Sequence, residues 1–125
     1  MTALHLICRP LDGGTLIGVA GELDCTNAAE LEAYIGGEHP DAALPLVLHL
    51  SAVTFMDSSG LHLLIDLHHR EDVAGGSLHL AAPHERVSRV LQITGTDRLL
   101  RTHPTLDQAL AAAGLAAPAT ADRVA

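Results

Sequence analysis

The feature that most constrains this chain is a short segment, Leu46–Leu50, in which every side chain except His49 is aliphatic. A strand that alternates apolar and polar residues covers a core on one face only, whereas a strand that is apolar at successive positions is buried on both faces. We therefore expect Leu46–Leu50 to be an interior strand flanked by helices. This expectation favours an α/β architecture.

The rest of the chain supplies further strands and helices for such a sheet. Asp12-Gly13-Gly14 is typical of a turn and separates two β-favouring runs, which predicts a hairpin. The predicted strands are residues 4–8, 15–20, 46–50, 77–81 and 99–102, and the predicted helices begin near Asn27, Asp57, Pro83 and Thr105. Because strands and helices alternate after the hairpin, we expect a single α/β domain over residues 1–114. Its mixed sheet should be mostly parallel and carry about four helices.

Capping patterns mark the starts of two of these helices. Asn27 is followed three residues later by Glu30, and Thr105 is followed three residues later by Gln108. In such a capping box the first side chain accepts a backbone N–H of the first turn. We expect both helices to be capped in this way.

Three segments are expected to lie outside the core. Ser51–Met56 is interpreted as a short connection after the interior strand, and the acidic pair Glu71-Asp72 as a solvated helix end. Residues 115–125 are rich in alanine and contain a proline, which predicts a disordered C-terminal tail.

Charge and aromatic content narrow the classes of function. The chain has 7 basic and 15 acidic residues, for a formal net charge of −8, and its only aromatic residues besides histidine are Tyr34 and Phe55. A nucleic acid duplex or an anionic membrane would repel such a surface, whereas a basic protein would be attracted to it. No apolar run approaches the ~18 residues that cross a bilayer, and Met1–Pro10 lacks the pattern of a signal peptide. We expect a cytoplasmic protein with no direct nucleic acid or membrane contact.

The stretch that carries candidate chemistry is Val53–Leu61, where a strand ends and a helix begins. It brings the carboxylate of Asp57 and the hydroxyls of Ser58 and Ser59 to a helix N-terminus, whose backbone N–H groups need acceptors. Either Asp57 or Ser58 can act as the N-cap, and if Ser58 does so, the Ser59 hydroxyl remains free and accessible. Gly60 is expected to leave room for another protein to approach.

The residues of this motif allow three interpretations. Asp-Ser-Ser-Gly is, in the simplest case, only a well-formed helix start, because Asp and Ser are preferred N-caps. Nucleophilic catalysis by Ser59 with a histidine is disfavoured, since the G-x-S-x-G elbow is missing. The third interpretation is a phosphorylation site on a binding surface, and the wider sequence favours it.

Seen together, Leu48–Ser51 and the run that ends at Gly60-Leu61 resemble the signature of the STAS domain. More narrowly, they resemble the bacterial anti-sigma factor antagonists. The resemblance extends from about residue 16 to residue 110. It includes Gly21-Glu22-Leu23-Asp24 before the first helix, and Ile93-Thr94-Gly95 with Asp97-Arg98 before the last short strand. It implies a single STAS-type domain.

The resemblance also implies a function. In that family the second serine of the motif accepts a phosphoryl group, which corresponds to Ser59 here. The donor is an anti-sigma factor with serine kinase activity, and a separate phosphatase removes the group. The unmodified protein binds the anti-sigma factor and so releases a sigma factor. ATP and magnesium belong to the kinase, so this chain is expected to need no cofactor and to be no enzyme. The implied partner-binding residues are Asp24, Asp57, Ser58, Ser59, Gly60 and Leu61.

Other readings of the chain stay open. A STAS module that works without phosphorylation, as a scaffold or a ligand-sensing subunit of a larger complex, would share the fold. An enzyme would need a pocket lined by convergent polar groups. His62, Asp66 and His69 share a helix face and could hold zinc or copper, but a solvated face is favoured because no cysteine joins them. Cys8 and Cys25 lack metal-ligand spacing and are expected to be reduced and partly buried.

Overall fold

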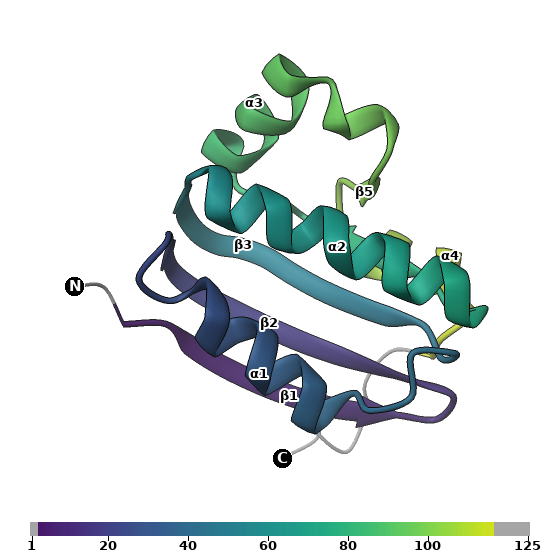
Figure 1. The fold of residues 1–125 in the computed structure, drawn as a ribbon. Coiled ribbons are helices and arrows are strands. Elements are labelled where there is room, and N and C mark those ends of the chain that lie inside the picture. Colours follow the sequence, from purple (N-terminus) through teal and green to yellow (C-terminus); the bar gives the residue numbers. More distant parts are fainter. Residues whose placement is uncertain (1–2, 117–125) are drawn as a thin grey trace, which may run out of the picture.

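Five strands and four α-helices make up residues 3–116, the part of the chain that the computed structural model describes (Figure 1). The elements are β1 His5–Leu11, β2 Gly14–Leu23, α1 Ala28–Glu38, β3 Leu46–Met56, α2 Ser58–Ala74, β4 Leu78–Ala81, α3 Glu85–Thr94, the 3-10 helix η1 Thr96–Arg98, β5 Arg101–His103 and α4 Leu106–Ala112. The strand order is β1-β2-β3-β4-β5, with β1 and β2 antiparallel and each later pair parallel. The predicted α/β class, hairpin and mostly parallel sheet are confirmed.

The helices cover the two faces of the sheet unequally. Figure 1 shows α1 and α2 side by side in front of the sheet, with α4 behind it. The larger hydrophobic core lies on the side of α1, α2 and α3, and the smaller one on the side of α4. The smaller core consists of Leu16, Val47, Ala81, Ala109, Leu110 and Leu115. The folded part thus includes Leu115, where the predicted tail begins, and residues 117–125 lie outside the described residues.

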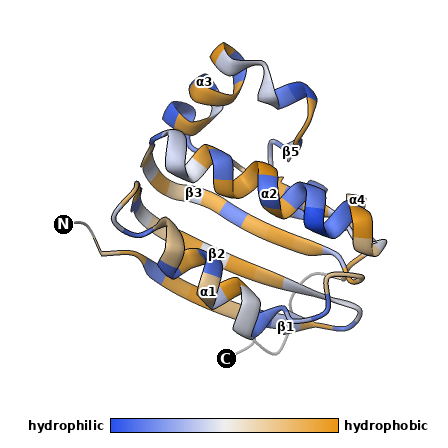
Figure 2. Cartoon of the chain, viewed as in Figure 1, coloured by the Kyte–Doolittle hydropathy of each residue, from blue (hydrophilic) through white to orange (hydrophobic). Residues whose placement is uncertain are grey.

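The interior strand is β3, and its side chains enter both cores. Leu46, Leu48 and Leu50 belong to the larger core, and Val47 belongs to the smaller one. Figure 2 shows hydrophobic colouring along most of β2 and β3, and mixed colouring along α2. Burial of this strand on both faces, as predicted, follows from its unbroken aliphatic run.

The strand continues further than predicted, and this extension positions the candidate site. Ser51–Met56 is not a connection but the second half of β3, which pairs with β2 up to the contact between Leu23 and Met56. Val53 and Met56 point into the larger core, while Phe55 is 45% exposed. Because the pairing with β4 ends at His49, the second half of β3 projects beyond β4 and carries the chain to Asp57.

Only one of the two predicted capping boxes has the expected cap. The hydroxyl of Thr105 accepts the Gln108 N–H at the start of α4, with 3.1 Å between oxygen and nitrogen. The prediction for Asn27 is wrong, since its side chain makes no cap hydrogen bond at the start of α1. Instead the Asn27 amide group accepts from the Asp24 N–H and donates to the Glu22 carbonyl. The asparagine therefore braces the loop that precedes the helix.

The acidic pair on α2 does not behave as a unit. Asp72 is exposed as predicted, but Glu71 is buried, and the prediction of a solvated pair is wrong for it. Both Glu71 carboxylate oxygens lie 3.2–3.3 Å from His39 Nε2, and His39 Nδ1 lies 2.8 Å from the Thr15 hydroxyl. Burial of these polar groups is tolerated because they satisfy one another's hydrogen bonds.

Candidate functional site

The candidate site lies where β3 ends and α2 begins, at the carboxyl end of the interior strand (Figure 1). Asp57 is the N-cap of α2, which decides between the two predicted candidates. Its Oδ1 accepts the N–H groups of Ser59 at 2.9 Å and Gly60 at 3.2 Å. The carboxylate thereby satisfies two of the donors that a helix start leaves unpaired.

The same carboxylate reaches the loop between β2 and α1. Its Oδ2 accepts the backbone N–H of Cys25 at 3.1 Å, and the Asp57 N–H donates to the Leu23 carbonyl at 3.2 Å. Two segments that are far apart in the sequence therefore meet at Asp57. The structure brings Asp24, next to Cys25, to the same region as the serine motif.

Internal hydrogen bonds fix the shape of this loop. The Asp24 carboxylate accepts both the N–H and the hydroxyl of Thr26, at 2.9 and 2.5 Å. The hydrogen bond from the Thr26 hydroxyl, followed by that from the Thr26 N–H, lowers the pKa of the Asp24 carboxyl below its ordinary value. Asp24 is therefore a carboxylate at neutral pH, held against Thr26 in the loop whose Cys25 N–H contacts Asp57.

The two serines of the motif differ in their surroundings. Ser58 is exposed, and Ser59 is partly exposed. The backbone N–H of Ser59 is held by Asp57, whereas its hydroxyl makes no hydrogen bond to any of residues 3–116. Because Asp57 does the capping, the Ser59 hydroxyl is available for a reaction or for a partner. No histidine is hydrogen-bonded to it among the described residues.

The next two residues lie beneath this surface. Gly60 and Leu61 are both buried. The expectation that Gly60 leaves room for another protein is wrong, because a Cβ atom there would come within 2.7 Å of Met56 Cγ and 2.9 Å of the Leu23 side chain. Glycine is needed so that α2 can begin close to β2 and β3. Gly60 and Leu61 therefore support the surface that Asp24, Asp57 and the serines form.

Two parts of the site were not predicted. The N–H of Cys25 belongs to the backbone, so no residue pattern announces its hydrogen bond to Asp57. Cys25 itself is exposed and Cys8 is partly buried, so the prediction of partial burial is confirmed for Cys8 and wrong for Cys25; both are free thiols.

The exposed ring of Phe55 lies two residues before Asp57 in the sequence. Burial after Leu50 does not alternate, since only Val53 and Met56 are buried among residues 51–56, so no strand period in the sequence marks Phe55 as exposed.

Within residues 3–116, no group of three or more His, Cys, Asp or Glu side chains lies close enough to hold a metal ion, the set of His62, Asp66 and His69 included. No helix in the described part of the chain has the length and apolar character needed to cross a membrane.

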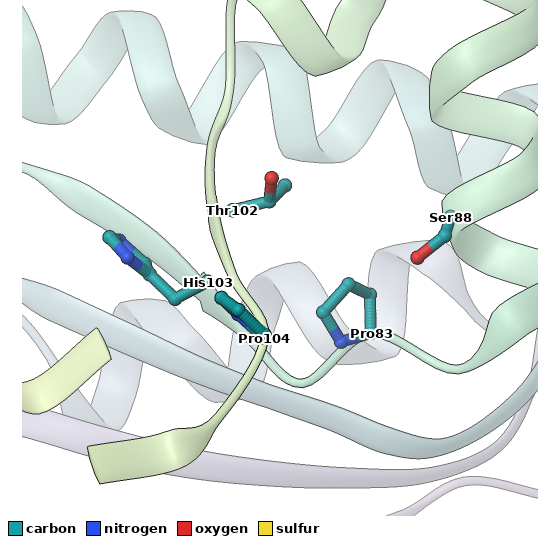
Figure 3. A pocket seen from close by; sticks show the side chains of 5 residues that line it. All are labelled: Pro83, Ser88, Thr102, His103 and Pro104. Carbon is teal, nitrogen blue, oxygen red and sulfur yellow. The ribbon is translucent and has the colours of Figure 1, made fainter. Parts of the chain in front are cut away.

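A separate cavity of about 420 Å³ lies between α3 and β5. It is lined by Pro83, Ser88, Thr102, His103 and Pro104. Figure 3 shows Ser88 and Thr102 facing each other across it, while the His103 ring turns to the other side of β5. None of the serine-motif residues lines this cavity.

Comparisons with known proteins agree with this architecture. The chain is 33% identical to the anti-sigma-F factor antagonist RsfB of Mycobacterium tuberculosis over 101 residues, which are 79% of this chain and 80% of RsfB. It is 28% identical to the anti-sigma-B factor antagonist of Staphylococcus aureus over 87 residues, which are 70% of this chain and 81% of that protein.

Solved structures give the same result. The crystal structure of an anti-sigma factor antagonist from Mycobacterium paratuberculosis superimposes with a TM-score of 0.80 at 31% identity, and covers 90% of this chain and 95% of that one. SpoIIAA in its unphosphorylated form shares the fold, with a TM-score of 0.70 at 22% identity over 92% of this chain and 100% of that one. The phosphorylated form of the Bacillus SpoIIAA has a TM-score of 0.63, also at 22% identity, over 98% of this chain and 100% of that one.

The family model of the STAS domain matches residues 9–109. This range is most of the described part of the chain and includes β2 to β5 and the serine motif. Together with the relatives that are anti-sigma factor antagonists and the shared fold, this match shows that the chain belongs to the STAS domain family.

Proposed function

We propose that this protein binds an anti-sigma factor, releases the sigma factor held by it, and is switched off by phosphorylation of Ser59. The observation that carries the proposal is the division of roles at the start of α2. Asp57 takes the capping hydrogen bonds, which leaves the hydroxyl of the partly exposed residue Ser59 without a partner among residues 3–116. The relatives named above are anti-sigma factor antagonists, which supports the choice of partner.

The docking surface of this proposal consists of Asp24, Asp57, Ser58 and Ser59, with Gly60 and Leu61 beneath it. It joins the β2–α1 loop to the start of α2 through the bond between Cys25 and Asp57. Because Asp24 and Asp57 are acidic and the whole chain has a net charge of −8, the surface suits a basic patch on the partner. Both proteins would act in the cytoplasm.

The covalent switch needs only chemistry that the partner supplies. On an anti-sigma factor with serine kinase activity, the Ser59 oxygen would attack the γ-phosphorus of ATP and form a new O–P bond. The bond between the γ-phosphorus and the bridging oxygen breaks, ADP leaves, and the hydroxyl proton passes to a base of the kinase. A separate phosphatase would direct water onto the phosphorus, restore the hydroxyl and release inorganic phosphate.

The phosphate would change the docking surface more than the fold. It adds about −1.5 to −2 charges and three acceptor oxygens at a helix N-terminus, which tolerates an anion. The same group is unfavourable in the interface, because it stands two residues from the Asp57 carboxylate and must lose water for the partner to approach. Reversing the occupancy of the complex from 99:1 to 1:99 requires about 5.5 kcal/mol of differential affinity.

The proposal is tested with a candidate anti-sigma factor, the best source being a kinase-like protein encoded beside this one. In a pull-down, we expect Ser59→Ala to retain the anti-sigma factor and Ser59→Asp to lose it. Ser58→Ala is the matched control, since Ser58 is the exposed neighbour. This variant should bind the anti-sigma factor before phosphorylation and release it once Ser59 is phosphorylated. Tandem mass spectrometry after incubation with ATP should place the phosphate on Ser59. Equal retention of Ser59→Ala and Ser59→Asp would refute the switch.

A second candidate function is a phosphorylation-independent scaffold or ligand-sensing role, and the cavity between α3 and β5 favours it. Ser88 and Thr102 offer two hydroxyls toward its interior (Figure 3). This alternative predicts an intact mass that does not change on incubation with ATP and candidate kinases. It also predicts that Ser88→Leu, which fills the cavity, alters the response of the larger complex, whereas the Ser59 switch does not depend on Ser88.

A further inference from the structure

The Asp57 carboxylate joins two parts of the molecule that the proposed switch needs. Its Oδ1 accepts the N–H groups of Ser59 and Gly60 on α2, and its Oδ2 accepts the N–H of Cys25 in the β2–α1 loop. One side chain therefore holds three backbone donors that belong to two separate elements. Whatever displaces the carboxylate acts on both elements at once.

The loop is braced internally, so its contact with Asp57 affects it as a whole. The Asp24 carboxylate binds the N–H and hydroxyl of Thr26, while the Asn27 side chain binds the Asp24 N–H and the Glu22 carbonyl. Residues 24–27 consequently form a small hydrogen-bonded unit. The bond from Cys25 to Asp57 fixes the side of this unit that faces α2.

A phosphate on Ser59 would compete with Asp57 for the same donors. The Ser59 N–H lies within the modified residue, and the Gly60 N–H belongs to the next one, so both are within reach of a phosphate on the Ser59 oxygen. A phosphate dianion is a stronger acceptor than a carboxylate because of its larger charge. The two anions also repel each other when they share one helix N-terminus.

We propose that phosphorylation of Ser59 displaces the Asp57 carboxylate from the N-cap position and thereby breaks its hydrogen bond with the Cys25 N–H. The β2–α1 loop, with Asp24, then loses its fixed position beside α2. The switch acts twice, since the phosphate obstructs the partner at Ser59 and also removes Asp24 from the docking surface. This inference rests on the proposed function and assigns Asp57 the role of a positioning residue.

Amide hydrogen exchange tests the inference without any kinase. Protein with phosphoserine incorporated at position 59 is compared with unmodified protein by nitrogen-15 NMR, and exchange is measured at the Cys25 N–H. We expect exchange at Cys25 to become about tenfold faster on phosphorylation, as for the loss of one charge-assisted hydrogen bond. Exchange in β4 is the internal reference and should not change. An unchanged Cys25 exchange rate would overturn the inference.

Variants of Asp57 decide whether the effect passes through this side chain. Asp57→Asn keeps one oxygen for the N-cap but loses the carboxylate, so it should speed exchange at Cys25 without any phosphate. Phosphoserine 59 should then add less than about a twofold change. Asp57→Ser, also a good N-cap, is the second variant should Asp57→Asn not fold. An undiminished phosphate effect in these variants would contradict the proposed route.

Phosphoserine at position 58 is the matched control, because the N–H of Ser58 is not among those that Asp57 accepts. It should change exchange at Cys25 much less than phosphoserine 59, and an equal change would contradict competition for shared donors. The same proteins are tested for binding to the anti-sigma factor. Loss of binding with an unchanged Cys25 amide would overturn this inference and leave the proposed function in place. Retained binding by phosphoserine 59 would overturn the proposed function itself.

Discussion

At the scale of single residues, Asp57 has more structural roles than any other member of the serine motif. Its carboxylate accepts from three backbone N–H groups, of Ser59, Gly60 and Cys25. The serines beside it contribute little to the fold, since the Ser59 hydroxyl has no partner among residues 3–116 and Ser58 is exposed. Stability and reactivity are thus assigned to different residues of one short motif.

This division predicts how the motif responds to alanine. Asp57→Ala removes the N-cap of α2 and the bond to Cys25, so it should lower the free energy of unfolding by about 1–2 kcal/mol. Ser58→Ala, at the exposed neighbour, should stay within about 0.5 kcal/mol of the original protein. Urea denaturation followed by circular dichroism measures both. Equal stability of the two variants would show that the carboxylate does not support the helix start.

Gly60 in α2 and Gly36 in α1 differ in the space around them. Gly60→Ala should destabilise the protein by about 1–3 kcal/mol, because the added Cβ would press on Met56 and Leu23 at less than 3 Å. At Gly36, in α1, a Cβ would meet no atom within 4 Å, so Gly36→Ala should raise stability by up to about 1 kcal/mol. Thermal melts of the two variants should therefore shift in opposite directions.

At the scale of elements, a buried cluster of polar side chains joins β2, α1 and α2. Thr15 on β2, His39 at the end of α1 and Glu71 on α2 form one chain of hydrogen bonds, and all three residues are buried. The contact holds the end of α1 against α2. The cluster stabilises the protein only while it is complete, because a buried polar group that has lost its hydrogen-bond partner lowers the free energy of unfolding.

Removal of Glu71 should reveal that cost. Glu71→Ala leaves the His39 Nε2 atom buried without its acceptor, and should lower the free energy of unfolding by about 3 kcal/mol. Asp72→Ala, one residue further on, removes only an exposed contact with Arg101 at 3.6 Å and should cost less than about 1 kcal/mol. Denaturant titrations at pH 7 compare the two, and similar losses would contradict the account.

Strands β4 and β5 carry a group that responds to acid. Burial, together with the neighbouring His103 and Arg101, lowers the pKa of His79 to about 4. As the pH falls, a histidine whose pKa is lower in the folded state is protonated first in the unfolded chain. The free energy of unfolding is therefore at its full value above about pH 6.5 and decreases as the pH falls toward 4. His79 accounts for a decrease of roughly 3 kcal/mol in the free energy of unfolding over this pH range.

A comparison of pH profiles isolates this contribution. His79 also hydrogen-bonds to Ser77 and His103, so His79→Gln should lower stability at pH 7 and flatten the decline between pH 6.5 and 4. His62→Gln, at an exposed position of α2, is the control and should leave the profile unchanged. An identical decline in the His79→Gln variant would assign the acid sensitivity to other groups.

How much the sequence could predict depends on whether an element is determined locally. The interior strand at Leu46–Leu50 is an aliphatic run, so its burial follows from its own residues. The extension at Ser51–Met56 could not be predicted in that way, because its pairing with β2 makes it a strand despite its exposed side chains. For the same reason the burial of Glu71 was missed, since its partner His39 is distant in the sequence.

The candidate site shows the same limit. Capping preferences, which act within one turn of helix, left both Asp57 and Ser58 possible as the N-cap, and the resemblance to the anti-sigma factor antagonists indicated Ser59. The docking of the β2–α1 loop against Asp57 depends on a backbone N–H of Cys25, which carries no signature in the sequence. Gly60 was identified as part of the motif, but its role in packing required the positions of Leu23 and Met56.

At the scale of the whole molecule, net charge and the position of the site act together. The chain has a net charge of −8, and two of its carboxylates, those of Asp24 and Asp57, belong to the proposed docking surface at one end of the sheet. A field of this size steers a basic partner during diffusion and is screened by salt over about 10 Å at 0.1 M. Charges far from the site should therefore influence how fast the complex forms more than how long it lasts.

Salt and charge variants separate these two effects in the complex with the anti-sigma factor. Between about 50 and 500 mM NaCl, the association rate constant should fall by about tenfold or more, while the dissociation rate constant changes by less than about threefold. Asp107→Asn, an exposed change on α4 behind the sheet, should reduce association only slightly and leave dissociation unaltered. Asp24→Asn, in the docking surface, should speed dissociation. Stopped-flow measurements give both constants, and an association rate that does not depend on salt would exclude steering by the acidic field.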